Sequence, residues 1–147
     1  MTLDDYERPL NKRGKRDAPF MGEKLKEQNI VPDIILASPA LRSKITAEVI
    51  AEKVDYVEDI VFDKTLYESS VSELKNALIK IDDENSVAFL FGHNTGINTF
   101  VENFVSLYEN VPTCGIVEIE FDCESWKDVS KNNAKLVSFD YPKKDQN

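Results

Sequence analysis

Two positions in this sequence carry side chains suited to phosphate chemistry, and each follows a short apolar segment. Arg42 comes shortly after Asp33–Ala37, and His93 comes shortly after Ser86–Phe91. An arginine guanidinium can hold two phosphate oxygens at once, and a histidine can gain or lose a proton near neutral pH. Gly92, directly before the histidine, allows a ligand to approach the backbone closely. The two positions together indicate a small anion-binding pocket.

Each candidate residue also has an ordinary structural explanation. A single histidine in a turn is more often structural or solvated than reactive, and an arginine in the first turn of a helix is commonly a surface residue. Glu68 could act as a general acid if it were buried, and would otherwise be a surface carboxylate. Arg8 and Arg13 could complete an anion pocket, although the mixed charges around them favour a solvated helix face. Spacing alone leaves both interpretations open.

The first junction that must position these side chains surrounds Arg42. Asp33–Ala37 is a short apolar run next to prolines, which predicts a buried strand. Ser38 followed by Pro39 predicts the start of a helix that continues to about Lys53, with the serine as its N-cap. The residues expected on the inward face of this helix are Leu41, Ile45 and Val49.

The second junction surrounds His93. Ser86–Phe91 is the most apolar run of the chain and predicts a central strand, followed by a turn at Gly92–Gly96. A helix is expected next, with apolar residues at helical spacing: Ile97, Phe100, Val101, Phe104, Val105 and Tyr108. Ligands of open α/β sheets bind beyond the carboxyl ends of the strands, where helix N-termini also favour phosphate. Both junctions therefore lie where a phosphate site is expected.

The rest of the chain alternates helix and strand patterns, which predicts an α/β domain. A helix is expected after an N-cap at Asn11, with Pro19 inside it. Ser70–Glu73 fits a capping box that starts a further helix. Three more strands are expected at 60–62, 115–121 and 135–139.

The composition excludes several functional classes. A chain of 147 residues has the size of one globular domain, and a formal net charge of −9 argues against binding nucleic acid or an anionic membrane. No apolar run approaches the ~20 residues of a membrane span. Cys114 and Cys123 form no CxxC pair, and no P-loop, dinucleotide fingerprint or zinc cluster is present. We therefore expect a cytoplasmic protein with no metal and no cofactor.

Five segments, in order along almost the entire chain, resemble the motifs of the phosphohistidine phosphatases, the SixA-like branch of the histidine phosphatase superfamily. These segments are Arg8–Met21, Leu36–Arg42 with its continuation Thr46–Glu48, Leu66–Glu68, Phe91–Gly96 and Val111–Gly115. Pro19, which local helix rules disfavour, is itself part of the resemblance. The specificity comes from the order of five motifs rather than from any one of them.

The resemblance implies a three-layer α/β/α sandwich like phosphoglycerate mutase, with a mostly parallel sheet. It implies metal-independent hydrolysis of phosphohistidine proteins through a covalent phosphohistidine intermediate. Arg42 would then hold the phosphate, His93 would be the second histidine of the pocket, and Asn94 would bind phosphate beside it. Glu68 would be a candidate proton donor. The implied partner is a phosphorylated protein or a small phosphomonoester.

The sequence departs from the family at the nucleophile. The family begins with a central strand that ends in Arg-His-Gly, and that histidine attacks phosphorus, whereas His93 is the single histidine here. We therefore expect residues 1–147 to form one N-terminally truncated domain, poorly stable and inactive as given. Two alternatives stay open: a non-catalytic pseudophosphatase that binds a phosphorylated partner, and a small-molecule phosphomonoesterase of the same superfamily.

Overall fold

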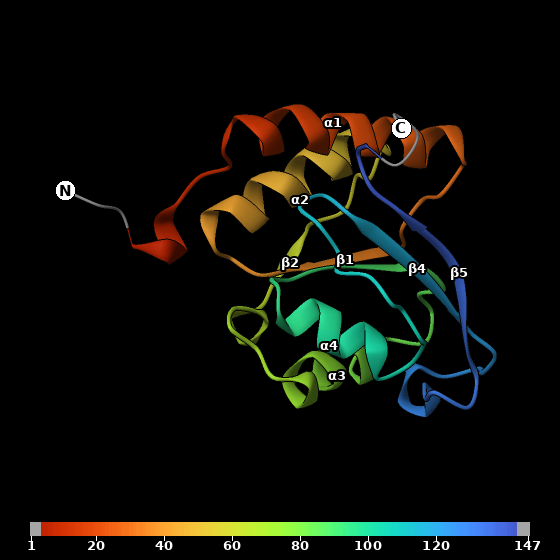
Figure 1. Cartoon of the computed structure of the whole chain (residues 1–147). Coiled ribbons are helices and arrows are strands. Elements are labelled where there is room, and N and C mark those ends of the chain that lie inside the picture. The colour runs from red at the N-terminus through yellow and green to blue at the C-terminus, as the bar shows by residue number, and fades with distance from the viewer. Residues whose placement is uncertain (1–3, 144–147) are drawn as a thin grey trace.

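The computed structural model describes residues 4–143 and has three layers, with a sheet between two pairs of helices (Figure 1). On one face lie α1 (Lys12–Glu27) and α2 (Leu41–Lys53), and on the other lie α3 (Val71–Ile79) and α4 (Gly96–Glu102). Three short 3-10 helices, η1 to η3, complete the helical elements: Asp5–Glu7, Lys64–Leu66 and Trp126–Asp128. The expected three-layer α/β architecture is therefore confirmed.

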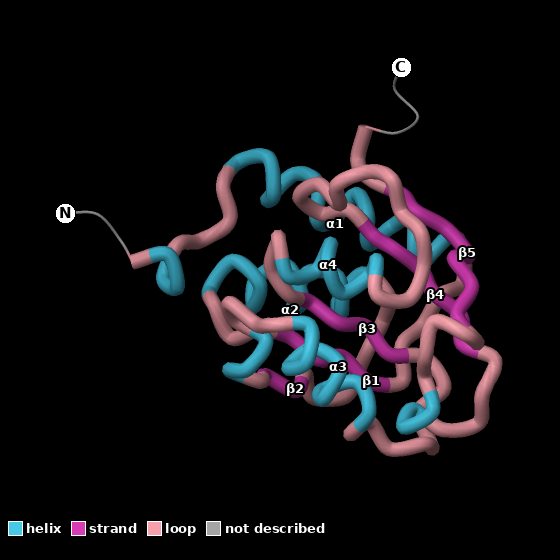
Figure 2. Tube along the Cα trace, turned by 60° about the horizontal axis from the view of Figure 1, so that its bottom comes forward, coloured by secondary structure: helices cyan, strands magenta, loops and turns pink. Residues whose placement is uncertain are grey.

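The strands form two separate sheets. The first is parallel, in the order β2-β1-β3, and contains β1 (Ile34–Ala37), β2 (Val61–Phe62) and β3 (Ala88–Phe91). The second is an antiparallel pair of β4 (Ile116–Phe121) and β5 (Ala134–Asp140). Figure 2 shows the three parallel strands together and the β4-β5 pair to one side. Within the described residues no pairing joins β3 to β4.

The parallel sheet is apolar on both faces, as expected for a sheet covered by helices on both sides. Alternate residues of β1 and β3, such as Ile35 and Phe89, face α1 and α2. The intervening residues, such as Leu36 and Leu90, pack against α3 and α4. Strand side chains alternate between faces, so each helical layer receives every second residue.

The helix starts at Asn11 and Ser70 are confirmed. The Asn11 side chain accepts a hydrogen bond from the Gly14 backbone N–H (2.9 Å), and Pro19 lies inside α1 as expected. Ser70 and Glu73 form a reciprocal capping box at the start of α3. Both caps satisfy backbone N–H groups that have no partner within the helix.

Two details of the helices differ from the sequence predictions. Ser38 is not the N-cap of α2: the cap residue is Ala40, whose backbone is extended, and it makes no side-chain capping bond. The buried residues of α2 are also not those expected, because the helix turns a different face to the core: Ser43, Ala47, Ile50 and Ala51. The helix after His93 ends at Glu102 rather than near Tyr108, which is 93% exposed.

Within the described part of the chain, no helix is long and apolar enough to cross a membrane. The two cysteines are free and partly buried. Burial raises the pKa of the Cys114 thiol to about 11, so this thiol is protonated and unreactive at neutral pH.

Candidate functional site

Parallel pairing of β1 with β3 brings the two candidate residues together. Ala37 lies opposite Phe91 in the register, so the segments that follow both strands begin at the same edge of the sheet. Ser38 and Arg42 extend from β1, and His93 extends from β3. The Arg42 Nη2 atom lies 3.2 Å from His93 Nδ1, and His93 Nε2 lies 2.8 Å from Ser38 Oγ. The structure therefore unites Arg42 and His93 in one cluster.

The neighbours of His93 determine which ring nitrogen carries the proton. A guanidinium can only donate, so Nδ1 must accept the hydrogen bond from Arg42. The Nε2–H group then donates to Ser38 Oγ, which also accepts a bond from the Ala40 backbone N–H (3.2 Å). Ser38 is fully buried. The residue predicted to cap α2 instead fixes the orientation of the imidazole.

The same surroundings favour the neutral imidazole. Burial of the ring lowers the pKa of His93 below its usual 6.5, and the nearby Arg42 cation lowers the pKa further. Asp5 acts in the opposite direction but does not reverse the shift. His93 is therefore uncharged at neutral pH and presents an accepting Nδ1 to Arg42.

Asp5 and Tyr67 also belong to the cluster, although neither was among the candidate site residues; Tyr67 lies within the Leu66–Glu68 motif. Arg42 donates from Nη1 to the Asp5 carbonyl oxygen (2.8 Å) and from Nη2 to Asp5 Oδ2 (3.2 Å). The Tyr67 hydroxyl donates to the same carboxylate oxygen (2.7 Å), and its ring meets His93 edge to face at 5.3 Å. The Asp5 carboxylate therefore already binds the Arg42 guanidinium, which was expected to hold phosphate.

Mutual hydrogen bonding shifts the ionisation of this pair. The bond from Tyr67, followed by the one from Arg42, lowers the pKa of Asp5. The bond to the Asp5 carboxylate raises the pKa of Tyr67 to about 12. Asp5 is therefore ionised and Tyr67 protonated at neutral pH, which fixes the hydroxyl as the donor.

The other sequence candidates lie close to the cluster without joining it. Asn94 Nδ2 donates to the Val111 carbonyl oxygen (2.6 Å), and Asn94 Oδ1 accepts from the Asn98 backbone N–H (3.0 Å). Both ends of the Asn94 amide thus hold the loop in place, and its role in phosphate binding stays a prediction.

Glu68 follows Tyr67 in the chain and is exposed, with a positive φ of 51°. This position does not provide the burial that the general-acid interpretation required, and the role of Glu68 also stays a prediction. Arg8 and Arg13 are exposed, in agreement with a solvated surface. Among residues 4–143 no group of three potential ligands could hold a metal ion.

A large cavity extends from this cluster into the domain. Its volume is about 1030 Å³, and its lining includes Arg42 and His93 as well as the walls of β3 and β4. Ser43, which follows Arg42 in α2, also lines the cavity, and its buried hydroxyl has no hydrogen-bond partner. The site is therefore the polar end of a mostly apolar cavity.

These features define an α/β domain with an arginine and a histidine at the carboxyl ends of adjacent parallel strands. A family model for the histidine phosphatase superfamily (branch 1) matches residues 4–90. The chain belongs to this superfamily, as the order of its motifs indicated. The matched region includes Arg42 and ends shortly before His93.

Solved structures share the fold at low sequence identity. The protein histidine phosphatase SixA complexed with tungstate superposes with a TM-score of 0.81 at 18% identity, over 97% of this chain and 89% of that one. A structure assigned as the phosphohistidine phosphatase SixA of Agrobacterium tumefaciens gives 0.78 at 22% identity, with the same coverage of 97% and 89%. These matches confirm the SixA-like fold.

A curated relative is an uncharacterized chloroplastic protein of Arabidopsis thaliana, 25% identical over 137 residues. The match covers 87% of this chain and 63% of the relative. This chain therefore spans less than two thirds of the relative's length.

Proposed function

We propose that the Arg42–His93 cluster binds the phosphoryl group of a phosphorylated protein, and that the function is that of a phosphohistidine phosphatase. The observation that carries the proposal is the contact of Arg42 Nη2 with His93 Nδ1 at 3.2 Å, beyond the carboxyl ends of β1 and β3. Membership of the histidine phosphatase superfamily supports this chemistry. The N-terminus of α2 lies beside the same cluster and adds a favourable dipole for an anion.

Phosphate would bind in place of the Asp5 carboxylate. Arg42 already directs two nitrogens at Asp5, so the same planar fork can take two phosphoryl oxygens. A dianion beside His93 would raise the pKa of the imidazole and favour a proton on Nδ1. His93 would then donate a hydrogen bond to the phosphoryl group instead of accepting one from Arg42.

Turnover needs a nucleophile that this sequence of 147 residues does not contain. In the mechanism implied by the resemblance, one histidine attacks phosphorus and the leaving group departs, and water then attacks the phosphohistidine and releases phosphate. A second histidine and an arginine stabilise the transferring group. With His93 as its single histidine, this polypeptide should bind phosphate without turning it over. Independence from metal and Glu68 as proton donor belong to the same proposal.

The test is binding of inorganic phosphate by titration calorimetry to the wild type and to Arg42→Lys. Lysine keeps the charge but loses the planar fork, so we expect about tenfold weaker binding or worse. Arg16→Lys is the matched control, because Arg16 pairs with Asp17 on α1 at 3.0 Å and is 62% exposed. Equal affinity of all three proteins would refute the site.

A non-catalytic phosphoprotein-binding function is the second candidate, and the single histidine favours it. Free imidazole separates the two functions. In a phosphatase site that lacks only its nucleophile, added imidazole should take the phosphoryl group from a phosphohistidine protein, which leaves with its histidine side chain free; water should then attack the phosphoimidazole and release phosphate and imidazole. In a pure binding site, imidazole should leave release at the buffer rate. Faster release from sugar phosphates than from phosphohistidine protein would instead favour a small-molecule phosphomonoesterase.

A further inference from the structure

The two ring nitrogens of His93 have different surroundings. Ser38, which directly follows β1, is fully buried, and its Oγ atom lies 2.8 Å from His93 Nε2. The other nitrogen, Nδ1, contacts Arg42 at the edge of the sheet where the proposed phosphate site lies. The ring therefore lies between a neutral, buried hydroxyl on one side and a cation that can turn to a ligand on the other.

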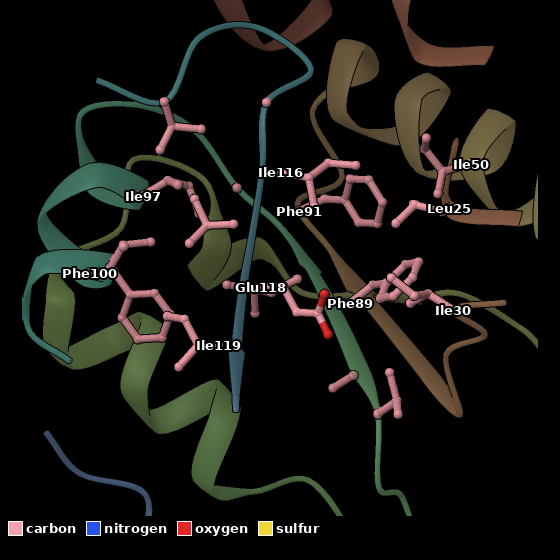
Figure 3. Close-up of a pocket in the computed structure, with 18 of the residues that line it drawn as sticks. Leu25, Ile30, Ile50, Phe89, Phe91, Ile97, Phe100, Ile116, Glu118 and Ile119 are labelled. Atoms are coloured by element: carbon pink, nitrogen blue, oxygen red, sulfur yellow. The ribbon is translucent and has the colours of Figure 1, made fainter. Parts of the chain in front are cut away.

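The position of Ser38 is fixed by its backbone as well as by its side chain. Its backbone N–H donates to the Phe91 carbonyl oxygen (3.0 Å), which continues the pairing of β1 with β3 beyond the end of β1. The Phe91 ring lies beside Ile116 and points toward Ile50 of α2 (Figure 3), so this end of β3 is itself packed against the apolar core. Because His93 comes only two residues after Phe91, the same short stretch of backbone holds both partners of the contact.

The hydrogen bonds at Ser38 Oγ have one consistent direction. The Ala40 backbone N–H donates to this oxygen (3.2 Å). His93 Nε2–H donates to it as well, because Arg42 already donates to Nδ1 of the neutral ring. A hydroxyl oxygen has two lone pairs, and these two bonds use both. Ser38 is therefore an acceptor toward His93 and does not donate to its ring.

The acceptor role of Ser38 does not depend on the charge of His93. Nε2 carries the proton of the neutral ring, and both nitrogens carry one in the imidazolium, so Nε2–H can donate to Ser38 in either state. The bond is stronger in the imidazolium, because a charged donor makes the stronger hydrogen bond. Arg42 of α2, Asp5 of η1 and Tyr67, which follows η2, also face the ring. Of these, Arg42 must leave Nδ1 when that nitrogen gains a proton, whereas Ser38 keeps its contact.

We propose that Ser38 is a positioning residue that keeps a proton on Nε2 of His93 and so confines the gain and loss of protons to Nδ1, the nitrogen directed at Arg42 and the phosphate site. The inference rests on the proposed function for its consequence: phosphate held by Arg42 meets a ring that can offer it an N–H only at Nδ1. Without the Ser38 hydroxyl, the imidazolium loses its buried acceptor, and the bound phosphate loses part of the protonated ring that assists it.

The first test uses the free, isotope-labelled full chain and NMR. His93 is the single histidine, so correlations from its ring carbon protons to the two ring nitrogens report which nitrogen carries a hydrogen. We expect the hydrogen on Nε2 at pH 7.5, and an acid titration in which Nε2 keeps its hydrogen while Nδ1 gains one. A hydrogen on Nδ1 at pH 7.5 would overturn the proposal.

The same titration is then compared between variants. Ser38→Ala deletes the acceptor and should lower the proton affinity of His93 about tenfold, since the charged ring loses the stronger bond. Ser38→Cys leaves less of a cavity but is a weak acceptor, so it should act in the same direction and decides the matter if Ser38→Ala does not fold. Ser38→Thr keeps the hydroxyl and should restore the wild-type midpoint.

Ser43→Ala is the matched control, because it deletes the hydroxyl of another buried serine, one that has no hydrogen-bond partner. This variant should leave the midpoint of His93 where it is. An unchanged midpoint in the folded Ser38 variants, or an equal shift in Ser43→Ala, would overturn the proposal.

The second test is calorimetric titration with inorganic phosphate at several pH values. The ratio of wild-type to Ser38→Ala affinity cancels the titration of phosphate itself. It should be several-fold at about pH 6 and approach one above about pH 8, where the ring is neutral in both proteins. A ratio that does not change with pH would show a merely structural role and overturn the proposal. If the wild type binds no phosphate, the proposed function fails, and the titration of the free chain decides the role of Ser38.

Discussion

β1 and β3 are neighbouring strands of the same sheet, equal in length and similarly apolar, yet they differ in burial. Three of the four residues of β1 are buried, whereas all four residues of β3 are only half-buried. The difference lies in their edges: β1 is paired on both sides, by β2 and β3, while β3 is paired on one side and faces the cavity on the other. Apolar composition is therefore enough for a strand to form, whereas burial of its side chains also depends on a neighbouring strand at each edge.

The difference has a functional side, because each strand leads into the cluster. Ser38 follows β1, and its hydroxyl accepts a hydrogen bond from one ring nitrogen of His93, which follows β3. Arg42 holds the other nitrogen. The polar cluster is thus held together by hydrogen bonds between its own residues, although β3, the strand that His93 follows, borders the cavity.

Truncation of one apolar side chain in each strand should give the largest difference between them. Ile35→Ala in β1 removes a fully buried side chain and should cost ~2–5 kcal/mol of unfolding free energy. Leu90→Ala in β3 should cost roughly 1–2 kcal/mol, because its side chain is only half-buried and borders the cavity. Urea unfolding at constant temperature measures both values. Equal costs of Ile35→Ala and Leu90→Ala would mean that β3 is as well packed as β1, and the comparison would be wrong.

The sequence predicted both strands but not their unequal burial, and the prediction that Ser86–Phe91 is the central strand was wrong, because β3 lies at the edge of the β2-β1-β3 sheet. Apolar runs at Asp33–Ala37 and Ser86–Phe91 are sufficient to indicate strands, whereas the number of paired edges depends on elements far away in the chain. The helix starts at Asn11 and Ser70 were predictable because capping is a local interaction. The assignment of Ser38 as a cap failed because its hydroxyl contacts His93, 55 residues away.

The candidate site shows the same limit. Arg42 and His93 could be found because each follows an apolar strand and a parallel sheet brings such ends together. Asp5 and Tyr67 could not be found in this way, since their contact joins residues 62 positions apart and Asp5 follows no predicted strand. Their side chains alone carry no signal for the pairing.

Lowering the pH should destabilise the folded chain through protonation of His93, which follows β3. Burial lowers the pKa of His93 in the folded chain, so the unfolded chain binds the proton first as the pH falls through about 6.5. Stability should therefore decrease from pH 7.5 toward pH 5.5. His93→Gln should lose this part of the dependence, as measured by urea unfolding at each pH.

His93 is the single histidine of the chain, so its imidazole NMR signals need no assignment. In the folded protein they should titrate below pH 6.5. A midpoint above 6.5 without phosphate would contradict the buried, neutral ring. Phosphate should raise the midpoint, because an anion beside the ring favours its charged form.

The smallest expected effect concerns the Asp5 carboxylate, which pairs with the Arg42 guanidinium. Asp5→Asn removes an anion that competes with phosphate for the guanidinium, so affinity for inorganic phosphate should rise about two- to fivefold. The gain is limited because Asp5 is exposed and its pairing with Arg42 is screened by solvent. Glu7→Gln makes the same charge change on an exposed residue of the same 3-10 helix, and controls for the general loss of negative charge. If both variants strengthen binding equally, net charge is the cause; if Asp5→Asn weakens binding, the carboxylate positions Arg42 for phosphate rather than competing with it.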